Sequence, residues 1–241
     1  MASRKGELID RSRAFAHDLQ ELLNQTVCDG AHVGAIIHPD GRTAAIGTGL
    51  YNVGRAAPTK VRTAGSVPCW LTIACRVYLD CDGYLTVEQS VYFLYTGVNP
   101  DQLDELLHYD YERDKEGYPE AHIQVIATSP AWESVLAASG KPKAGVGKLH
   151  LPVGGRRFRP ALEDLLEALI EEGILEGAPG WTRIIGEHRD KFRKLQLRAA
   201  IRRDPEVAAV ALQGLGYTVH PPDRSSLAKI LPFSGKGRRK K

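Results

Sequence analysis

Two alternating apolar runs joined by a tight turn constrain the fold of this chain more than any other part of its sequence. In Trp70–Asp80 and again in Tyr84–Tyr95, apolar residues occupy alternate positions, which is the pattern of half-buried strands. The dipeptide Asp82-Gly83 between the two runs is a strong signal for a two-residue hairpin turn. The middle of the chain is therefore predicted to form an antiparallel meander.

Further strands and helices are expected on both sides of this meander. A second hairpin is predicted for His32–His38 and Thr43–Thr48. A strand–helix–strand crossover with right-handed parallel pairing is predicted to join Ala121–Ala127 to Lys148–Val153. The predicted helices are residues 7–24, 100–108, 130–138, 160–172, 181–203 and 205–215. The predicted loops are residues 52–68 and 109–119.

These elements predict an α+β fold in which helices pack on a mostly antiparallel sheet of about six strands, followed by a helical C-terminal portion. We expect the sheet domain to span residues 1–158 and the helical portion packed on it to span residues 159–220. Residues 221–241 are predicted to form a basic, disordered tail. A chain of 241 residues is long enough to bury a sizeable core in one large domain.

The composition is that of an ordinary globular protein, with 43% hydrophobic and 25% charged residues and a net charge of only +3. The sequence contains no apolar run of membrane-spanning length and no apolar signal-peptide core near its first residues. Its cysteines form no Cys-x-x-Cys pair and match no zinc spacing, so we expect reduced thiols in a cytoplasmic protein. These cysteines are Cys28, Cys69, Cys75 and Cys81.

A glycine-arginine loop precedes a predicted helix. Gly154 and Gly155 allow the backbone to turn, and Arg156, Arg157 and Arg159 follow directly. Arginine side chains beside the N–H groups of a helix start can bind a phosphate or a carboxylate. The same arginines can instead pair with acidic residues in the first helical turn. A phosphate-binding loop and an internal ion pair therefore both stay open as interpretations.

Two histidines lie on the strands that the crossover is expected to join. Because side chains alternate along a strand, His122 and His150 can point to the same sheet face and act as general acid and base on a phosphodiester. The pair resembles the histidine-x-serine/threonine motifs of two-histidine phosphoesterases. It departs from them in its short spacing of 28 residues and in Gln124 and Pro152, which replace the hydroxyl residues, so we assign no membership. The catalytic hypothesis requires close rings that are open to solvent, and it fails if either histidine is buried with a backbone partner or if the two face opposite sides of the sheet.

The predicted helix at residues 181–203 is rich in lysine and arginine. Lys191, Lys194, Arg198 and Arg202 recur at helical spacing and form a stripe that can follow a nucleic-acid backbone. The competing interpretations are a solvated face and a partner for the acidic helix that precedes it.

The predicted loop at residues 109–119 combines acidic residues with three tyrosines and leads directly into His122. Its carboxylates could ligate a divalent ion or form a partner surface, and a polar loop over a sheet edge is the ordinary alternative. The acidic residues are Asp110, Glu112, Asp114 and Glu116.

The leading hypothesis is a phosphodiester- or nucleotide-acting protein, such as a small nuclease or a toxin-like effector. In it His122 and His150 exchange protons, Arg156 and Arg157 hold the phosphate, and the basic helix extends the contact with RNA or DNA. The alternative is a non-enzymatic regulatory module that binds nucleic acid or a protein partner. We expect no cofactor and no membrane contact and assign no metal ligands, and the sequence leaves open whether a metal ion is used and whether the protein is an enzyme.

Overall fold

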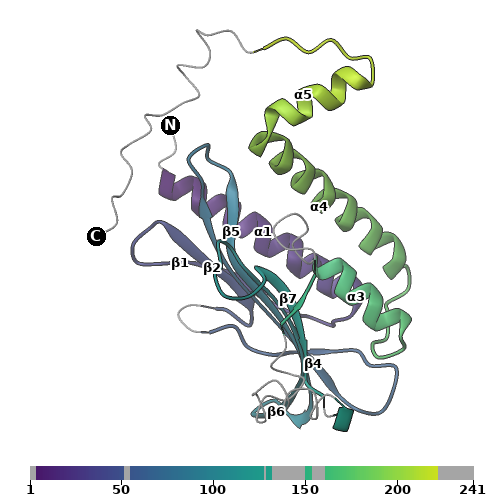
Figure 1. The fold of residues 1–241 in the computed structure, drawn as a ribbon. Helices are drawn as coiled ribbons and strands as arrows, with labels where there is room; N and C mark the ends of the chain where they lie inside the picture. Colours follow the sequence, from purple (N-terminus) through teal and green to yellow (C-terminus); the bar gives the residue numbers. More distant parts are fainter. Residues whose placement is uncertain (1–3, 52–54, 128, 132–149, 154–160, 222–241) are drawn as a thin grey trace. The chain divides into compact units, whose positions relative to one another are not determined.

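The computed structural model describes residues 4–51, 55–127, 129–131, 150–153 and 161–221, and it has the predicted α+β fold (Figure 1). The described strands are β1 (Val33–Ile37), β2 (Thr43–Thr48), β3 (Thr59–Val61), β4 (Cys69–Leu79), β5 (Leu85–Asn99), β6 (Gln102–Glu112), β7 (Ala121–Val125) and β8 (Leu151–Pro152). The described helices are α1 (Arg4–Thr26), α3 (Leu162–Glu171), α4 (Trp181–Arg203) and α5 (Pro205–Gly214). Each of these helices agrees with a predicted range to within a few residues.

The described strands form one eight-stranded sheet, which is larger than expected. Its order is β1-β2-β4-β5-β6-β7-β8, with β3 paired to β4 outside this path, and every pairing is antiparallel. The predicted meander lies at its centre, where β4 pairs with β5 from Cys69 opposite Thr96 to Leu79 opposite Leu85. In the turn between them, Gly83 has a φ of 82°, a conformation that favours glycine.

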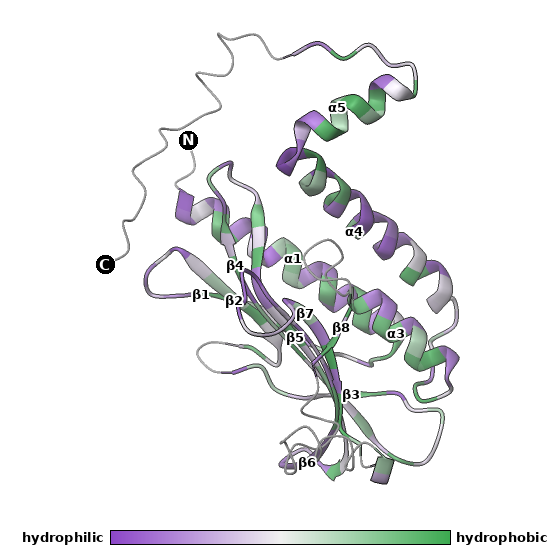
Figure 2. Ribbon diagram, in the orientation of Figure 1, coloured by the Kyte–Doolittle hydropathy of each residue, from purple (hydrophilic) through white to green (hydrophobic). Residues whose placement is uncertain are grey.

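α1 and α3 contribute to a single core with one face of the sheet (Figure 1). Leu22 and Leu23 of α1 are fully buried with Leu71 and Ile73 of β4, and Leu166 of α3 belongs to the same cluster. Burying one such side chain stabilises a fold by about 1.5–3 kcal/mol. α4 adds Ile184 and Ile185 to this cluster and is otherwise coloured mainly as hydrophilic in Figure 2.

The helix predicted for residues 100–108 is wrong, because these residues belong to the turn after β5 and to strand β6. Asn99 pairs with Gln102 across a tight turn, so the chain reverses at once and continues as a strand. Leu103, Leu106 and Leu107 have helical spacing in the sequence. In the strand, the register shifts between Leu107 and Glu105, so Leu106 is the extra residue of a β-bulge. Pairing with β5 and β7 overrides the local helical pattern.

Three further expectations about strands and loops need correction. The loop predicted for residues 52–68 contains β3, and the loop predicted for residues 109–119 begins as the end of β6. β7 and β8 pair antiparallel, with His122 opposite Pro152, whereas a parallel crossover was expected. Antiparallel pairing continues the hydrogen-bonding pattern of the whole sheet, and the N–H of Val153 donates to the carbonyl of Ala121 at 3.1 Å. The helix predicted for residues 130–138 lies outside the described residues except at its first two positions.

The chain forms two compact units, residues 1–194 and 195–241. The sheet domain was expected to end at residue 158. α3 lies after that position, yet its leucines belong to the core of the first unit. In the second unit, the Asp204 side chain caps α5 by accepting from the N–H of Val207 at 3.2 Å, and no residue of α5 is buried. Residues 222–241, nearly all of the predicted tail, lie outside the described residues. Every helix within the described ranges is too short or too polar to traverse a lipid bilayer.

Candidate functional site

The sheet face opposite α1 and α3, which we call the open face, carries polar and aromatic side chains. Along β4, the core residues Leu71, Ile73 and Cys75 alternate with Thr72, Ala74 and Arg76 on the open face. The strand pairing then aligns the open-face residues of neighbouring strands. Phe93 of β5 lies opposite Thr72 of β4 on one side and His108 of β6 on the other.

The open face contains a cavity of about 710 Å³, which we call the hollow. Its lining combines apolar and aromatic side chains with charged groups of both signs. Among the described residues, the charged and ring-bearing groups that line it are Arg55, Arg76, Phe93, Tyr95, Asp110, Tyr111, Glu112, Tyr118 and His122. A volume of about 300–1,000 Å³ is typical of small-molecule sites, so the hollow has the size for a ligand such as a nucleotide.

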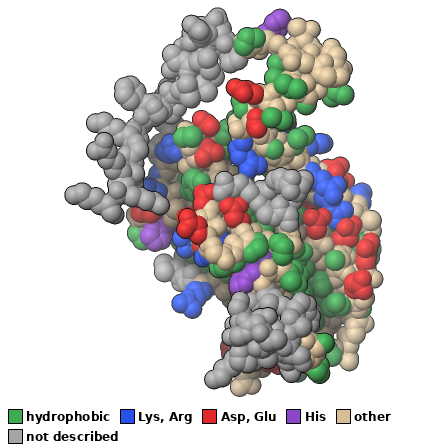
Figure 3. Space-filling model, viewed as in Figure 1, with side chains coloured by type: hydrophobic (Ala, Val, Ile, Leu, Met, Phe, Trp, Pro, Cys, Tyr) green, Lys and Arg blue, Asp and Glu red, His purple; other side chains and the backbone are tan. Residues whose placement is uncertain are grey.

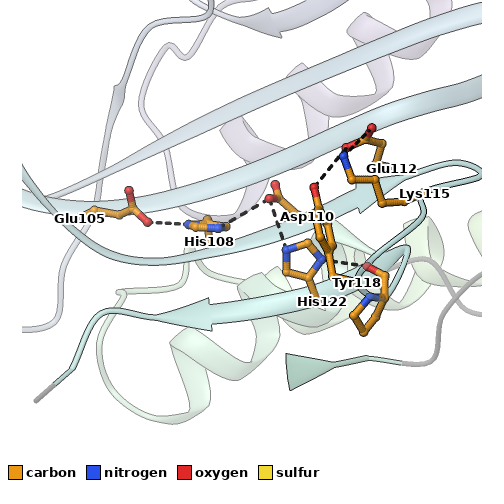
Figure 4. A network of polar contacts seen from close by, with 8 residues as sticks. Glu105, His108, Asp110, Glu112, Lys115, Tyr118 and His122 are labelled. Carbon is orange, nitrogen blue, oxygen red and sulfur yellow. Dashed lines mark hydrogen bonds and ion pairs between the residues drawn. The ribbon is translucent and has the colours of Figure 1, made fainter. Parts of the chain in front are cut away.

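Three polar side chains meet at one side of the hollow, and we call them the His-Asp cluster: His108, Asp110 and His122. His108 and Asp110 are two residues apart on β6 and share a face, and the register places Asp110 opposite His122 of β7. The Nε2 atoms of both imidazoles lie 3.6 Å from the same Asp110 oxygen, Oδ2. Figure 4 shows the contacts between these side chains, which come from two adjacent strands.

The second nitrogen of each imidazole is held by a protein acceptor. Nδ1 of His122 lies 3.1 Å from the carbonyl oxygen of Pro119, and Nδ1 of His108 contacts Oε1 of Glu105 (Figure 4). Glu105 reaches His108 because of the bulge at Leu106: residues three apart on a regular strand face opposite sides, and the extra residue turns both to the same side. A carbonyl or carboxylate oxygen accepts a hydrogen bond, so each of these contacts places a ring proton on Nδ1 and leaves Nε2 as the nitrogen that faces Asp110.

The carboxyl group of Asp110 lies in a partly dehydrated environment. Burial raises its pKa above 3.8, and the neighbouring imidazoles of His108 and His122 act in the opposite direction. His122 is almost fully buried, with 2% of its side chain exposed, whereas 34% of the Asp110 side chain is exposed. The cluster thus has a closed side at His122 and an accessible side at Asp110.

His150 lies against the ring of His122. The two ring centroids are 4.7 Å apart at an interplanar angle of 61°, and His150 also stacks on Tyr118 at 4.4 Å. The structure therefore brings together the two histidines singled out from the sequence, although their strands pair antiparallel. His150 is exposed, but His122 is buried and has a backbone partner. His122 thus does not meet the requirement that both rings be open to solvent, which argues against proton exchange by both histidines and for a structural or positioning role of His122.

The acidic segment predicted as a loop divides into two parts. Asp110 and Glu112 belong to β6 and line the hollow. Glu112 accepts hydrogen bonds from Lys115 Nζ at 3.1 Å and from the hydroxyl of Tyr118 at 3.4 Å, which holds the Tyr118 ring near the histidines. Asp114 is not among the residues that line the hollow. The same holds for Glu116.

The basic residues of α4 are used in more than one way. Lys191 Nζ lies 2.6 Å from Asp18 Oδ2 of α1, so one member of the predicted stripe forms an internal ion pair. Arg189, outside the stripe, pairs with Asp164 Oδ1 at 2.9 Å and with Glu167 of α3. Acidic and basic side chains also lie side by side on the face seen in Figure 3. Lys194, Arg198 and Arg202 are exposed.

The predicted phosphate loop lies outside the described residues. This applies to Gly154, Gly155, Arg156, Arg157 and Arg159. The acidic residues expected as alternative partners for these arginines, those in the first turn of the following helix, are Glu163 and Asp164. Asp164 pairs with Arg189, and Glu163 is buried at 8% exposure.

Sequence reasoning missed Glu105, His108 and both arginines of the hollow. The signal for His108 was present, because His108 and Asp110 are two residues apart and would share a face on a strand. It was hidden by the assignment of residues 100–108 to a helix.

Comparison of the chain with protein-family models, curated proteins and solved structures found no match. The interpretation of the site therefore depends on its geometry.

Proposed function

We propose that this protein binds a nucleotide or a short phosphodiester in the hollow and acts on its phosphate group. The observation that carries the proposal is the presence of Arg55 and Arg76 in the same cavity as Asp110 and His122. Guanidinium groups bind phosphate oxygens with two parallel hydrogen bonds, and imidazole and carboxylate groups transfer protons near neutral pH.

The rest of the hollow suits the remaining parts of such a ligand. Phe93, Tyr95 and Tyr118 offer aromatic surface on which a base or another flat group can stack. Arg76 faces Glu88 at 3.7 Å, a distance that leaves its guanidinium able to exchange that partner for a phosphate. The size, the aromatic surface and the two arginines favour a nucleotide over a purely apolar ligand.

In this proposal His150 is the proton-transferring group that meets the substrate, because it is exposed. His122, between Asp110 and His150, positions the His150 ring from its buried side. The predicted phosphate loop, with Arg156 and Arg157, would add to the binding of the phosphate. The proposal includes the expected cytoplasmic location.

The test is turnover of a pool of nucleotides and short RNA and DNA strands, with products identified by mass spectrometry. We expect the wild type to convert at least one member of the pool, His150→Ala to lose about 100-fold or more in rate, and Arg76→Ala to bind it more weakly. The matched controls are His38→Ala and Arg42→Ala, which remove the same side chains in and beside the β1–β2 turn, away from the hollow. Absence of turnover by the wild type, or equal loss in the controls, would overturn the proposal.

A second function, non-enzymatic binding of RNA or DNA by α4, is favoured by the exposure of Lys194 and Arg198 on one helix. Such binding would place the chain among regulatory modules. Phosphate contacts by lysine and arginine give affinity that falls steeply with salt, which makes the two functions separable by experiment.

A further inference from the structure

The contacts of the His-Asp cluster leave its three inward-facing atoms without a hydrogen bond among them. The distance of 3.6 Å from each Nε2 to Asp110 Oδ2 exceeds the usual 2.7–3.2 Å of an N–H···O bond. Because Nδ1 of each ring faces its own acceptor, Nε2 is the nitrogen that each ring presents to the carboxylate. Two imidazole nitrogens and one carboxylate oxygen thus converge on one point without bonding to one another, which is the arrangement of ligands around a cation.

The spacing of these atoms suits a metal ion. One ligand atom from each of His108, Asp110 and His122 lies within 4.8 Å of the other two. Ligands 2.0–2.2 Å from a tetrahedral ion lie about 3.3–3.6 Å apart, which matches the two distances to Asp110 Oδ2. A small closure of the two imidazoles would complete the site.

The surroundings of the cluster are also those of a metal site. Histidines that bind metals commonly donate their other ring N–H to a carboxylate or a backbone carbonyl, which fixes the ring and its tautomer. Here the carboxylate of Glu105 accepts from Nδ1 of His108, and the carbonyl of Pro119 accepts from Nδ1 of His122. The bulge at Leu106 is what brings Glu105 to this position.

We propose that His108, Asp110 and His122 bind a divalent transition-metal ion, zinc in the first instance, with at least one coordination position facing the hollow. Two imidazoles and one carboxylate suit zinc better than calcium or magnesium, which prefer oxygen ligands. Three protein ligands leave room for a water molecule or a substrate oxygen, as in catalytic zinc sites. Asp110 and His122 line the hollow, so the ion would border the space proposed for the phosphate.

The metal site can be tested without substrate and so does not depend on the proposed function. Chelator-stripped, full-length protein is titrated with zinc in competition with a chromophoric chelator, and bound zinc is counted by elemental analysis. We expect one zinc per chain, a Co²⁺ derivative that absorbs strongly in the visible range, and an affinity about 100-fold or more lower in His108→Ala and Asp110→Asn. Glu105→Gln, which keeps all three ligands, should weaken binding by about 10-fold.

The matched control is His38→Ala, which removes an exposed histidine from outside the cluster and should bind zinc like the wild type. Each variant is first checked for a native circular dichroism spectrum. The Co²⁺ spectrum is recorded on the wild type, so this measurement does not depend on the folding of any variant. A wild type that binds no stoichiometric zinc would overturn the inference, as would folded His108→Ala and Asp110→Asn proteins that bind it normally. Zinc binding without turnover would contradict only the proposed function, and turnover by a protein that binds no metal would contradict only the metal site.

Discussion

At the scale of single residues, Arg62 joins the end of α1 to β3. Its Nη1 donates to the carbonyl of Cys28 at 3.2 Å and its Nη2 to the carbonyl of Thr26 at 2.6 Å. It also pairs with Asp29, and 24% of its side chain is exposed. One guanidinium thus binds the last carbonyl group of α1, where the helix supplies no partner, and a second carbonyl just beyond the helix end.

We expect Arg62→Lys to lower the free energy of unfolding by about 1–3 kcal/mol, because an ammonium group cannot reproduce this fork of hydrogen bonds. Urea denaturation of the two proteins measures the difference. Arg42→Lys, at an exposed turn position, is the control and should match the wild type to within about 0.5 kcal/mol. A similarly small effect at Arg62 would show that its contacts add little to stability.

The cysteines should differ sharply in reactivity. Within the described residues they form no disulfide; Cys28, Cys69 and Cys75 are buried, and Cys81 is exposed. Burial raises the pKa of Cys28 from 9.0 to about 12, and a thiol reacts only as its thiolate.

At pH 8, iodoacetamide should therefore modify Cys81 in the native protein and all cysteines only after unfolding in urea. Labelling of Cys28 should increase only as the pH rises toward 12, provided that the fold persists. Mass spectrometry of labelled peptides gives the measurement, and Cys81→Ser should abolish native labelling. Modification of native Cys28 at the rate of Cys81 would contradict its burial.

At the scale of elements, the sequence predicted those whose local pattern agrees with their tertiary surroundings. β4 alternates strictly, β5 alternates on either side of a bulge at Glu88, and the two strands enclose an Asp-Gly turn. α1 has a regular apolar stripe. β6 was not predicted as a strand because the extra residue of its bulge, Leu106, breaks the alternation. Leu103, Leu106 and Leu107 then fall at helical spacing in the sequence. A bulge is defined by its partner strand, and single-sequence periodicity does not contain that partner.

The exposed charges of α4 give a prediction for that helix alone. If α4 binds nucleic acid, Lys194→Glu combined with Arg198→Glu should weaken RNA binding. It should also make the slope of log affinity against log salt concentration less steep by about 1.4–1.8, since each of the two lost phosphate contacts removes about 0.7–0.9. Fluorescence anisotropy at several salt concentrations measures both quantities. Arg183→Glu, at the start of the same helix, is the matched control. Unchanged RNA binding in the double variant would exclude the stripe as the binding surface.

At the scale of the whole molecule, the candidate site could be predicted only in part. The sequence pointed to Asp110, His122 and His150, because carboxylates and imidazoles are the groups that carry proton transfer. It could not place Asp110 opposite His122, since that pairing depends on the register of β6 against β7. The arginines of the hollow come from a loop and from β4, and only the folded sheet brings them near the cluster.

The division of the chain into two units gives a prediction about stability. α5 buries none of its residues, so deletion of residues 205–241 should change the melting temperature of the first unit by no more than about 2 °C. Differential scanning calorimetry of the full-length and shortened proteins provides the comparison. A decrease of about 10 °C would show that the C-terminal unit stabilises the sheet.

In contrast, Leu166→Ala in α3 should destabilise the fold by about 2–5 kcal/mol, because that side chain is fully buried.

The alternation along β4 to β7 also has a consequence for how this protein can change over evolutionary time. Substitutions at Ile73 or Leu71 alter the core, whereas those at Thr72 or Ala74 alter the hollow and leave the apolar side intact. Ligand preference and folding are therefore encoded mostly at interleaved positions of the same strands, and Cys75 and Ile46 are positions that contribute to both. A lineage, or a laboratory library confined to the open face, can acquire a new specificity while each intermediate sequence still folds.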